Sequence, residues 1–496
     1  MKVGLGNPTM PPHAPRDLGH FREHDKFQKN AKTELNNSTQ RRNLNYATTQ
    51  IRLKRQGVVD ELDDWQQLRE AGSTIKRDTL ARLPELLEQF EENVTKRGGH
   101  VHWARDSKEA SQIVTDLIKK TGETDVVKIK SMATQEIALN DVLEENGISA
   151  RETDLAELIV QLGDDFPSHI VVPAIHRNRA EIRDIFTQNM PGARQDLTAE
   201  PAELAEASRK FLREQFMKAK VAISGCNFGI AETGSVSIVE SEGNGRMCLT
   251  LPETLITVMG IEKILPSYED LGVFMQLLPR SSTGERMNPY TSIWSGVTEN
   301  DGPQDFHIVL VDNGRTRMLA DEFREMLRCI RCGACMNHCV VYRQIGGHAY
   351  GATYPGPMGA VLTPALQGVD KSRDLPHACT LNGRCQEVCP VGIPLPALLR
   401  GWRDRSWREG LVPQTVRSGL GLWRFAAERP WLYRLGTAAA VRAMRLFRRG
   451  GWIARMPLAG AWTRYRDLPA PAGRTFMEQL RAQERTRTRP SPERGR

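Results

Sequence analysis

Residues 329–339 read CIRCGACMNHC and residues 379–390 read CTLNGRCQEVCP, and these two runs hold seven of the nine cysteines in the 496-residue chain. The first run has the spacing that wraps three thiolates around one iron–sulfur cluster and sends a fourth thiolate to a neighbouring cluster. Pro390 follows the last cysteine of the second run. Proline cannot donate a backbone hydrogen bond, so it ends the preceding turn and frees Cys389 to reach the first run. The spacing therefore predicts two clusters with crossed ligands.

Each predicted cluster takes ligands from more than one part of the motif. The first cluster is assigned to Cys329, Cys332, Cys335 and Cys389, and the second to Cys339, Cys379 and Cys385. A regular second run would carry cysteine at position 382, where this chain has Asn382. The second cluster is therefore either a three-iron cluster or a four-iron cluster whose fourth ligand is Asn382, water or another residue.

Two other uses of these cysteines fit the sequence less well. Zinc sites usually carry two C-x2-C pairs rather than a triple run closed by C-x3-C. Disulfides are typical of secreted proteins, whereas this long charged chain opens without a secretory apolar segment. Cys226 and Cys248 stand alone in apolar surroundings and are predicted to be small buried side chains.

Charge is unevenly distributed along the chain. The net charge is +8, but residues 401–496 hold 21 Arg, no Lys and 7 acidic residues, a balance of +14 that leaves −6 for the first 400 residues. Six of the nine tryptophans also lie in this segment. It fits either docking onto an anionic membrane surface or an acidic partner, or helices whose tryptophans pack on the cluster domain. No apolar run is long enough to predict a transmembrane helix.

Three zones precede the basic segment. Residues 1–63 form a polar N-terminal extension, and residues 64–315 alternate short apolar runs with helical stretches, which is typical of an α/β domain with a mainly parallel sheet. Strands are predicted in HVHWA, DVVKIK, SHIVVPAI, KVAISG, SVSIVE, RMCLTL and HIVLVD. Helices are predicted at 107–120, 133–146, 179–188 and 199–218.

The cysteine zone at 316–400 is predicted to be an α-helical ferredoxin domain. The two runs are separated by 39 residues, far more than a compact ferredoxin hairpin needs, and their flanks look helical. A basic, Trp- and Arg-rich helical region is expected at 401–475. The tail at 476–496 has too little apolar content to pack and is predicted to be disordered.

Polar residues near strand ends are the candidates for substrate binding. Glu232, Thr233 and Ser235 lie in a Gly-bearing turn that can present N–H groups and hydroxyls to a small anion, although an ordinary hairpin turn explains this fragment better. Ser131 can cap the following helix and leave its N-terminus open to an anion. His176 follows a predicted strand at its carboxyl end and is expected in the pocket.

Five blocks, in order along residues 40–470, resemble the LutB-type lactate utilization iron–sulfur proteins. They are KIKSMATQEIALNDVLEENGI, ETDLAELIVQL, PSHIVVPAIHRNR, AETGSVSIVESEGN and the double cysteine set. The resemblance implies a LUD domain, related to isomerase and CoA-transferase-like α/β folds, before the ferredoxin domain. It also implies a role in oxidising L-lactate to pyruvate. The chain departs from the family at Ala156 and Leu158, where Gly and Tyr are expected.

The resemblance further implies two partner subunits, a cysteine-rich iron–sulfur protein and a smaller LUD-only protein. The expected location is the cytoplasm, with peripheral contact at the inner membrane face as an open alternative, and no nucleic-acid partner is expected. No GxGxxG motif opens a βαβ unit, so an integral NAD or FAD site is not predicted. The sequence assigns neither a catalytic base nor a hydride acceptor.

Two further function classes stay open. The chain can be a non-catalytic, redox-sensing scaffold whose LUD domain binds a small carboxylate, instead of an electron-transfer subunit. A CoA-transferase-like enzyme with Glu232 as its nucleophile is disfavoured, because such an enzyme has no need of clusters.

Overall fold

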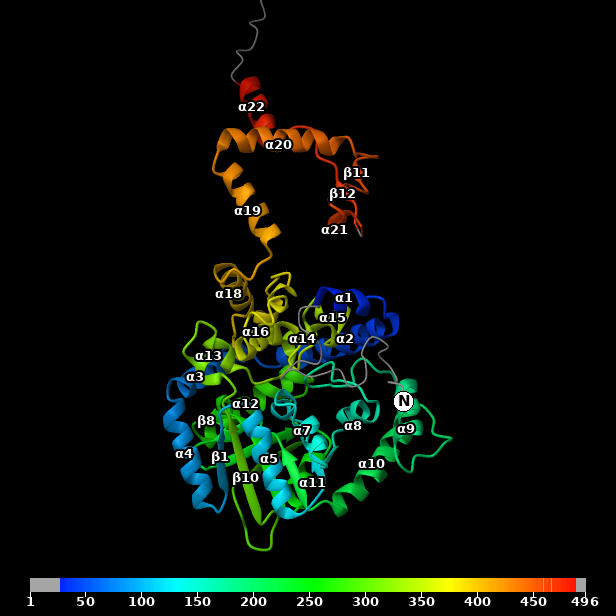
Figure 1. Cartoon of the computed structure of the whole chain (residues 1–496), viewed down its shortest axis with the longest axis vertical. Helices are drawn as coiled ribbons and strands as arrows, with labels where there is room; N and C mark the ends of the chain where they lie inside the picture. Colours follow the sequence, from blue (N-terminus) through cyan, green and yellow to red (C-terminus); the bar gives the residue numbers. More distant parts are fainter. Residues whose placement is uncertain (1–26, 458, 465, 488–496) are drawn as a thin grey trace, which may run out of the picture. The chain divides into compact units, whose positions relative to one another are not determined.

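The computed structural model describes residues 27–457, 459–464 and 466–487 (Figure 1). The chain divides into two compact units, one ending at Glu409 and the other beginning at Gly410. The first unit contains a six-stranded sheet, its covering helices and both cysteine runs.

A fully parallel sheet with the order β1-β10-β7-β4-β2-β3 forms the centre of the first unit. Its strands are β1 (His100–Ala104), β2 (Asp125–Lys128), β3 (Ser149–Glu152), β4 (Val221–Ser224), β7 (Thr254–Gly260) and β10 (Asp305–Val311). The central strands β4 and β7 are buried along their whole length, which is typical of parallel sheets. The predicted α/β class with a parallel sheet is confirmed.

The helix α5 (Ser107–Thr121) covers part of this sheet. Its fully buried Val114 and Ile118 lie in one hydrophobic core with Ile223, Val258 and Val309 from three neighbouring strands. Burial of such side chains contributes roughly 1.5–3 kcal/mol each, so this core fixes the positions of the strand ends.

A smaller mixed sheet has the order β8-β5-β6-β9. Strands β5 (Phe228–Ile230) and β6 (Ser235–Glu240) form an antiparallel hairpin, and β9 (Tyr290–Trp294) pairs antiparallel with β6. The short β8 (Ile264–Leu265) pairs parallel with β5 and follows β7 closely along the chain. The small sheet is therefore anchored beside the carboxyl end of the central strand.

The segment SHIVVPAI is not a strand, contrary to the prediction. Residues 168–176 form bends and turns between α8 (Leu155–Leu162) and α9 (Arg179–Asn189). The buried His169 ring explains this shape, because its Nδ1 accepts the backbone N–H groups of Val171 and Val172 at 3.0 and 3.1 Å. These N–H groups are then no longer available to a sheet.

The segment RMCLTL is also not a strand, because residues 244–250 form the helix α11 (Asn244–Thr250). The carboxylate of Glu240 accepts the backbone N–H groups of Gly243 and Arg246, which tightens the chain into the first turn of the helix. Buried side chains at Asn244, Cys248 and Leu249 follow helical spacing.

The cysteine zone contains helices and no strand between residues 312 and 409, all of which are described. Its elements are α13 (Arg315–Leu319), η3 (Arg324–Arg328), α14 (Ala334–Asn337), α15 (Tyr342–Ile345), η4 (His348–Tyr350), α16 (Gly356–Gln367), η5 (Leu375–His377), α17 (Arg384–Glu387) and α18 (Leu395–Arg408). The last helix runs across residue 400 and is tied to the zone by Trp402. This indole stacks on Phe323 with ring centroids 3.7 Å apart, and its Nε1 donates to the carbonyl of Val361.

The polar extension is helical from residue 27 onward, and residues 1–26 lie outside the described residues. The N-terminal helices are α1 (Phe27–Glu34), α2 (Ser38–Asp60), α3 (Trp65–Ala81) and α4 (Leu83–Lys96). The first two are joined to the cysteine zone by hydrogen bonds. The backbone N–H of Phe27 donates to Asp374 (2.8 Å), and the guanidinium of Arg55 donates to the carbonyl of Val388 (3.1 Å).

The second unit is built from small elements with little buried surface. They are α19 (Gln414–Ala427), α20 (Pro430–Arg445), β11 (Trp452–Ile453), α21 (Gly460–Thr463), β12 (Leu468–Pro469) and α22 (Phe476–Arg487). Neither α19 nor α20 has a buried residue, and Trp423 and Trp431 are 61% and 67% exposed. Within the described ranges, no helix combines the length and the apolar character needed to span a bilayer.

A helix forms over 476–487, part of the tail for which disorder is predicted. Thr475 and Glu478 cap its start reciprocally: the backbone N–H of Glu478 donates to the Thr475 hydroxyl, and the backbone N–H of Thr475 donates to the Glu478 carboxylate. This local capping needs no apolar core. Residues 488–496 lie outside the described residues.

Candidate functional site: two cysteine sets and an adjoining cavity

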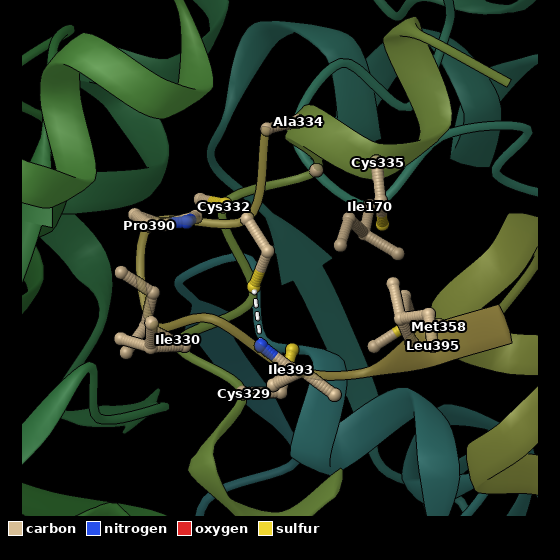
Figure 2. Close-up of a pocket in the computed structure, with 13 residues that line it drawn as sticks. Ile170, Cys329, Ile330, Cys332, Ala334, Cys335, Met358, Pro390, Ile393 and Leu395 are labelled. Carbon is tan, nitrogen blue, oxygen red and sulfur yellow. Dashed lines mark hydrogen bonds between the residues drawn. The ribbon is translucent and has the colours of Figure 1, made fainter. Parts of the chain in front are cut away.

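Four cysteines from the two runs line one small apolar cavity (Figure 2). They are Cys329, Cys332, Cys335 and Cys389. The rest of the wall is apolar and comes from Ile170, Ile330, Ala334, Met358, Val391, Ile393 and Leu395, among others. The fold therefore brings together the four thiols that the spacing assigns to one cluster.

The electrostatics of this cavity fit a bound cationic group. Burial and the neighbouring thiolates raise the pKa of Cys332 to about 12 and the pKa of Cys335 well above its ordinary value. Thiols in such surroundings stay protonated unless positive charge compensates them. Four thiols around one apolar cavity are the donor set of a four-iron cluster, whose iron supplies that charge. The residues present fit such a cluster, and its individual ligands stay a prediction.

Cys339, Cys379 and Cys385 form a second set. Burial, and then the proximity of the other two thiols, raise the pKa of Cys385 to about 12. This set lies nearer the surface, because two of its three cysteines, Cys339 and Cys379, are partly exposed, against only Cys329 in the first set. The adjacent Val340 and Leu381 are 47% and 37% exposed.

The two runs use the same backbone conformation. Arg331 and Leu381 both have left-handed φ angles, +60° and +57°, and each is followed two residues later by a glycine with positive φ, Gly333 and Gly383. The backbone N–H of Arg331 donates to Cys329 Sγ at 3.4 Å, and that of Leu381 donates to Cys379 Sγ at 3.2 Å. Donation to sulfur stabilises the thiolate form, so each loop is shaped to hold a charged sulfur.

A larger cavity of about 420 Å³ lies at the carboxyl edge of the parallel sheet. Its lining includes Lys130 after β2, Cys226 after β4, Lys263 after β7 and Arg315 after β10. Parallel sheets bind ligands at this edge, and cavities of this size hold small molecules. Ile170 lines both this cavity and the cavity of the first cysteine set, and Arg331, from between two of the cysteines, lines the larger one.

A buried ion-pair network forms the side of the larger cavity that adjoins the cysteines. Glu262 accepts from Arg331 Nη2 at 3.2 Å and from Arg315 Nε, and Arg315 donates to both carboxylate oxygens of Glu136 at 2.9 Å. The guanidinium of Arg331 also lies 5.0 Å from the ring centroid of Tyr354. Although burial alone would raise it, the pKa of Glu262 is lowered to about 2 by these two arginines. The network therefore stays charged and fixes Arg331.

Two cationic groups on this side have unused hydrogen-bonding capacity. Lys263 lines the cavity, and no residue that the structure describes accepts a hydrogen bond from its ammonium group or forms an ion pair with it. Burial and the neighbouring Arg331 lower the pKa of Lys263 to about 8. Arg331 Nη1 is also buried without an acceptor among the described residues.

The other side of the cavity is acidic. Asp154, Glu240 and Glu242 line it, together with Lys130, whose ammonium donates to the carbonyl of Val171 at 2.6 Å. Burial and the nearby Asp154 raise the pKa of Glu242. The cavity therefore has a cationic side at the cysteines and an acidic side away from them.

The residues predicted for substrate binding are not brought together. Ser131 lines the larger cavity, and its hydroxyl accepts the backbone N–H of Thr134 at the start of α6 (Met132–Glu136). Glu232, Thr233 and Ser235 lie at the opposite end of β6 and do not line it. Their contacts are local: Glu232 accepts the backbone N–H of Tyr268 (2.9 Å), and the Ser235 hydroxyl donates to Thr233 (2.7 Å). Whether these residues bind substrate stays a prediction.

His176 lies outside both cavities, in a buried polar cluster. Its Nε2 is 2.8 Å from Asp165 Oδ2, and Arg177 pairs with the same carboxylate. Asp165, His176 and His348 each place a ligand atom within 4.8 Å of the others, as a metal site would. The arginine already supplies positive charge there, which disfavours a bound cation. The cluster instead joins the 165–177 loop to the cysteine zone.

Sequence reasoning missed the main polar residues of the cavity: Glu262, Lys263, Arg315 and Arg331. One signal for them exists. The charged pair Glu262 and Lys263 directly follows the apolar run TLITVMGI, just past the carboxyl end of a strand. No such signal marks Arg331, because the cysteines on either side dominate its surroundings.

Family models match three consecutive parts of the chain. They are the LUD domain at residues 87–311, a 4Fe-4S dicluster domain at 325–393 and the lactate utilisation protein B C-terminal region at 417–485. The fold and the two cysteine sets thus define an iron–sulfur protein with a LUD domain.

Curated relatives match nearly the whole length. Lactate utilization protein B of Bacillus licheniformis is 43% identical over 459 residues, which cover 91% of this chain and 96% of that protein. The protein of the same name from Bacillus thuringiensis is 42% identical over 458 residues, with the same coverage. The chain belongs to the lactate utilization protein B family. A solved structure of a DUF162 family protein from Deinococcus radiodurans overlaps 46% of this chain and 98% of its own, at 14% identity and a TM-score of 0.26, too low to carry an argument.

Proposed function

We propose that this chain is the iron–sulfur electron-transfer subunit of a complex that oxidises L-lactate to pyruvate. One observation supports this most directly: the cavity of the LUD sheet and the cavity of the first cysteine set share Ile170 as a wall. A ligand in the larger cavity would therefore lie beside the buried cysteines. The choice of lactate as the substrate rests on the relatives, which are named for lactate utilization.

The arrangement of the cysteines suits transfer toward the surface. Clusters held by such thiolates exchange single electrons, and two of them suit a donor that releases a pair. In this proposal Cys329, Cys332, Cys335 and Cys389 hold the inner cluster, and Cys339, Cys379 and Cys385 hold the outer one. A helical ferredoxin domain at 316–400 positions both sets. The exposed Val340 and Leu381 beside the outer set offer an apolar contact for an electron acceptor.

In this proposal the partner subunits provide the reaction steps to which no residue of this chain is assigned. Lactate oxidation removes a hydroxyl proton and the equivalent of a hydride, and we assign the hydride acceptor to a partner. The partners are a cysteine-rich iron–sulfur subunit and a LUD-only subunit, in a cytoplasmic complex. The basic second unit, with exposed Trp423 and Trp431, is the docking surface for them, and the inner membrane face is the competing occupant.

Anaerobic reconstitution tests the proposal. The three proteins together should reduce an artificial electron acceptor in an L-lactate-dependent reaction. Omission of this chain, or its replacement by the Cys332→Ser variant, should abolish that reaction. A redox-sensing scaffold would leave the rate unchanged in both cases. Trapping of a CoA thioester on Glu232 would instead favour transferase chemistry, although this carboxylate lies outside the cavity and caps the N–H of Tyr268.

A further inference from the structure

The cationic side of the larger cavity contains a charge imbalance. Lys263 lies close enough to Arg331 for the two cations to repel each other: burial first, and then the nearby Arg331, lower the pKa of Lys263, while Glu262 and the Cys329 thiol oppose that shift. The Glu262 carboxylate is already used by Arg315 and by Arg331 Nη2. The ammonium of Lys263 and the Nη1 donor of Arg331 therefore have no acceptor among the described residues.

An unpaired buried cation is costly unless a ligand compensates it. Arg331 is held rigidly, with only 8% of its side chain exposed, by its bond to Glu262 and by the Tyr354 ring. Lys263 follows the central strand β7 directly, in the short turn η2 (Ile261–Lys263). Two neighbouring cations that both line one cavity, each with an N–H donor that has no acceptor among the described residues, match the two oxygens of a carboxylate.

We propose that Lys263 and Arg331 form a binding site for the carboxylate of a small 2-hydroxy or 2-oxo acid. The choice of a 2-hydroxy or 2-oxo acid rests on the proposed function. The charge arrangement alone indicates only that the ligand carries a carboxylate. The acidic side of the cavity, with Asp154 and Glu242, offers acceptors for a hydroxyl group. A three-carbon acid fills only part of about 420 Å³, so longer acids of the same class also fit.

Calorimetric titration of the anaerobic full-length protein, without partners, tests this site with L-lactate and with pyruvate as probes. The wild type should bind at least one of them, and Lys263→Gln should weaken binding about ten- to hundredfold, the range expected for a charged hydrogen bond. Lys263→Arg should retain most of the affinity. Lys220→Gln is the matched control, because Lys220 is 58% exposed, pairs with Glu123 and does not line the cavity.

Electron paramagnetic resonance adds a readout that does not depend on turnover. Each variant should keep the wild-type cluster signals, which shows that it is folded. The probe should perturb one cluster signal in the wild type and not in Lys263→Gln. Equal binding by wild type and Lys263→Gln, or no binding by the wild type, would overturn the inference. Neither result would contradict the proposed function, because that function is tested separately, by L-lactate-dependent dye reduction with the partners present.

Discussion

Asn382 occupies, in the second cysteine run, the position that Cys332 holds in the first. Each residue follows a left-handed residue, Leu381 or Arg331, and precedes a glycine with positive φ. In the structure the Asn382 side chain is exposed, and its Oδ1 accepts the backbone N–H of Arg384 at 3.3 Å. The loop thus keeps the shape of a ligand loop, while the Asn382 side chain accepts a hydrogen bond from the backbone within that loop.

This equivalence predicts that Asn382→Cys adds a fourth thiolate to the second cluster without moving the backbone. The wild-type protein should show a three-iron signal as isolated, because an iron with no thiolate at an exposed position is lost on oxidation. The variant should show a four-iron signal that survives air longer. Iron and sulfide analysis with electron paramagnetic resonance measures both. Asn382→Ser is the control and should behave like the wild type. Two fully thiolate-ligated four-iron signals in the unmodified protein would contradict the prediction.

The crossed ligand sets predict which substitutions share an effect. Cys332→Ser and Cys389→Ser should remove the same cluster signal, because both thiols line one cavity. Cys339→Ser should remove the other signal, since its thiol faces Cys379 and Cys385. Cys226→Ser, outside both sets, is the control and should retain full iron content. Loss of one common signal in the Cys332 and Cys339 variants would show that the ligands are not crossed.

Arg331 should raise the reduction potential of the first cluster. Its backbone N–H donates to Cys329 Sγ, and its guanidinium stays charged beside the cysteine cavity. Arg331→Gln removes a positive charge that favours the more negative, reduced cluster, so the reduction potential should fall by an amount on the order of tens of millivolts. A redox titration followed by electron paramagnetic resonance measures the shift. Arg331→Lys keeps the charge and should shift the potential less. An unchanged potential in Arg331→Gln would refute this role.

Buried Glu157 should make stability depend on pH. Burial and the nearby Glu152 raise the pKa of Glu157, whose Oε1 accepts from Gln135 Nε2 at 2.8 Å. Above the ordinary glutamate pKa the folded protein holds a proton that the unfolded chain releases, so stability falls as pH rises toward the raised value. The urea midpoint of the wild type should therefore drop between pH 6 and pH 8, and Glu157→Gln should drop less. The exposed Glu200→Gln should follow the wild type, and parallel curves for all three proteins would contradict the assignment.

The division after Glu409 predicts two different truncation results. Deletion of residues 410–496 should leave both cluster signals intact and abolish co-purification with the partners, because this stretch is a separate unit. Deletion of residues 401–496 should also lower iron content. It removes Trp402, stacked on Phe323, and Arg405, which pairs with Asp321 at 2.7 Å. Iron analysis of the two proteins separates the cases, and equal cluster loss in both would show that the second unit belongs to the cluster domain.

The cysteine sets could be read from the sequence because ligand spacing is set by covalent geometry. The parallel sheet was equally accessible, since apolar runs such as VAIS in β4 alternate with helices. The segments SHIVVPAI and RMCLTL were misassigned because a short apolar run does not distinguish a strand from other buried structure. A single side-chain interaction decided each case, the His169 ring in one and the Glu240 carboxylate in the other.

The residues that line the larger cavity could not be predicted from the sequence in the same way. Lys263 and Arg331 lie far apart along the chain, and only the packing of the LUD sheet against the cysteine zone makes them neighbours. The helix cap at Ser131 is predictable from the sequence because a cap is a local feature, whereas substrate binding by Ser131 stays a prediction. His176 was expected in the pocket on the premise of a strand that does not form, and its ring turns to Asp165 instead.

The hydrogen bonds from Phe27 to Asp374 and from Arg55 to Val388 have a consequence for the order of biosynthesis. The helices α1 and α2 dock on residues that the ribosome makes 347 and 333 positions later. At typical translation rates, roughly 20 to 70 seconds separate the emergence of these helices from that of the segments they bind. During that interval α1 and α2 have no final place, so a nascent chain must keep their apolar side chains from aggregating. If the first cluster assembles only after Cys389 has been made, α1 and α2 would dock at about the same time as the cluster forms.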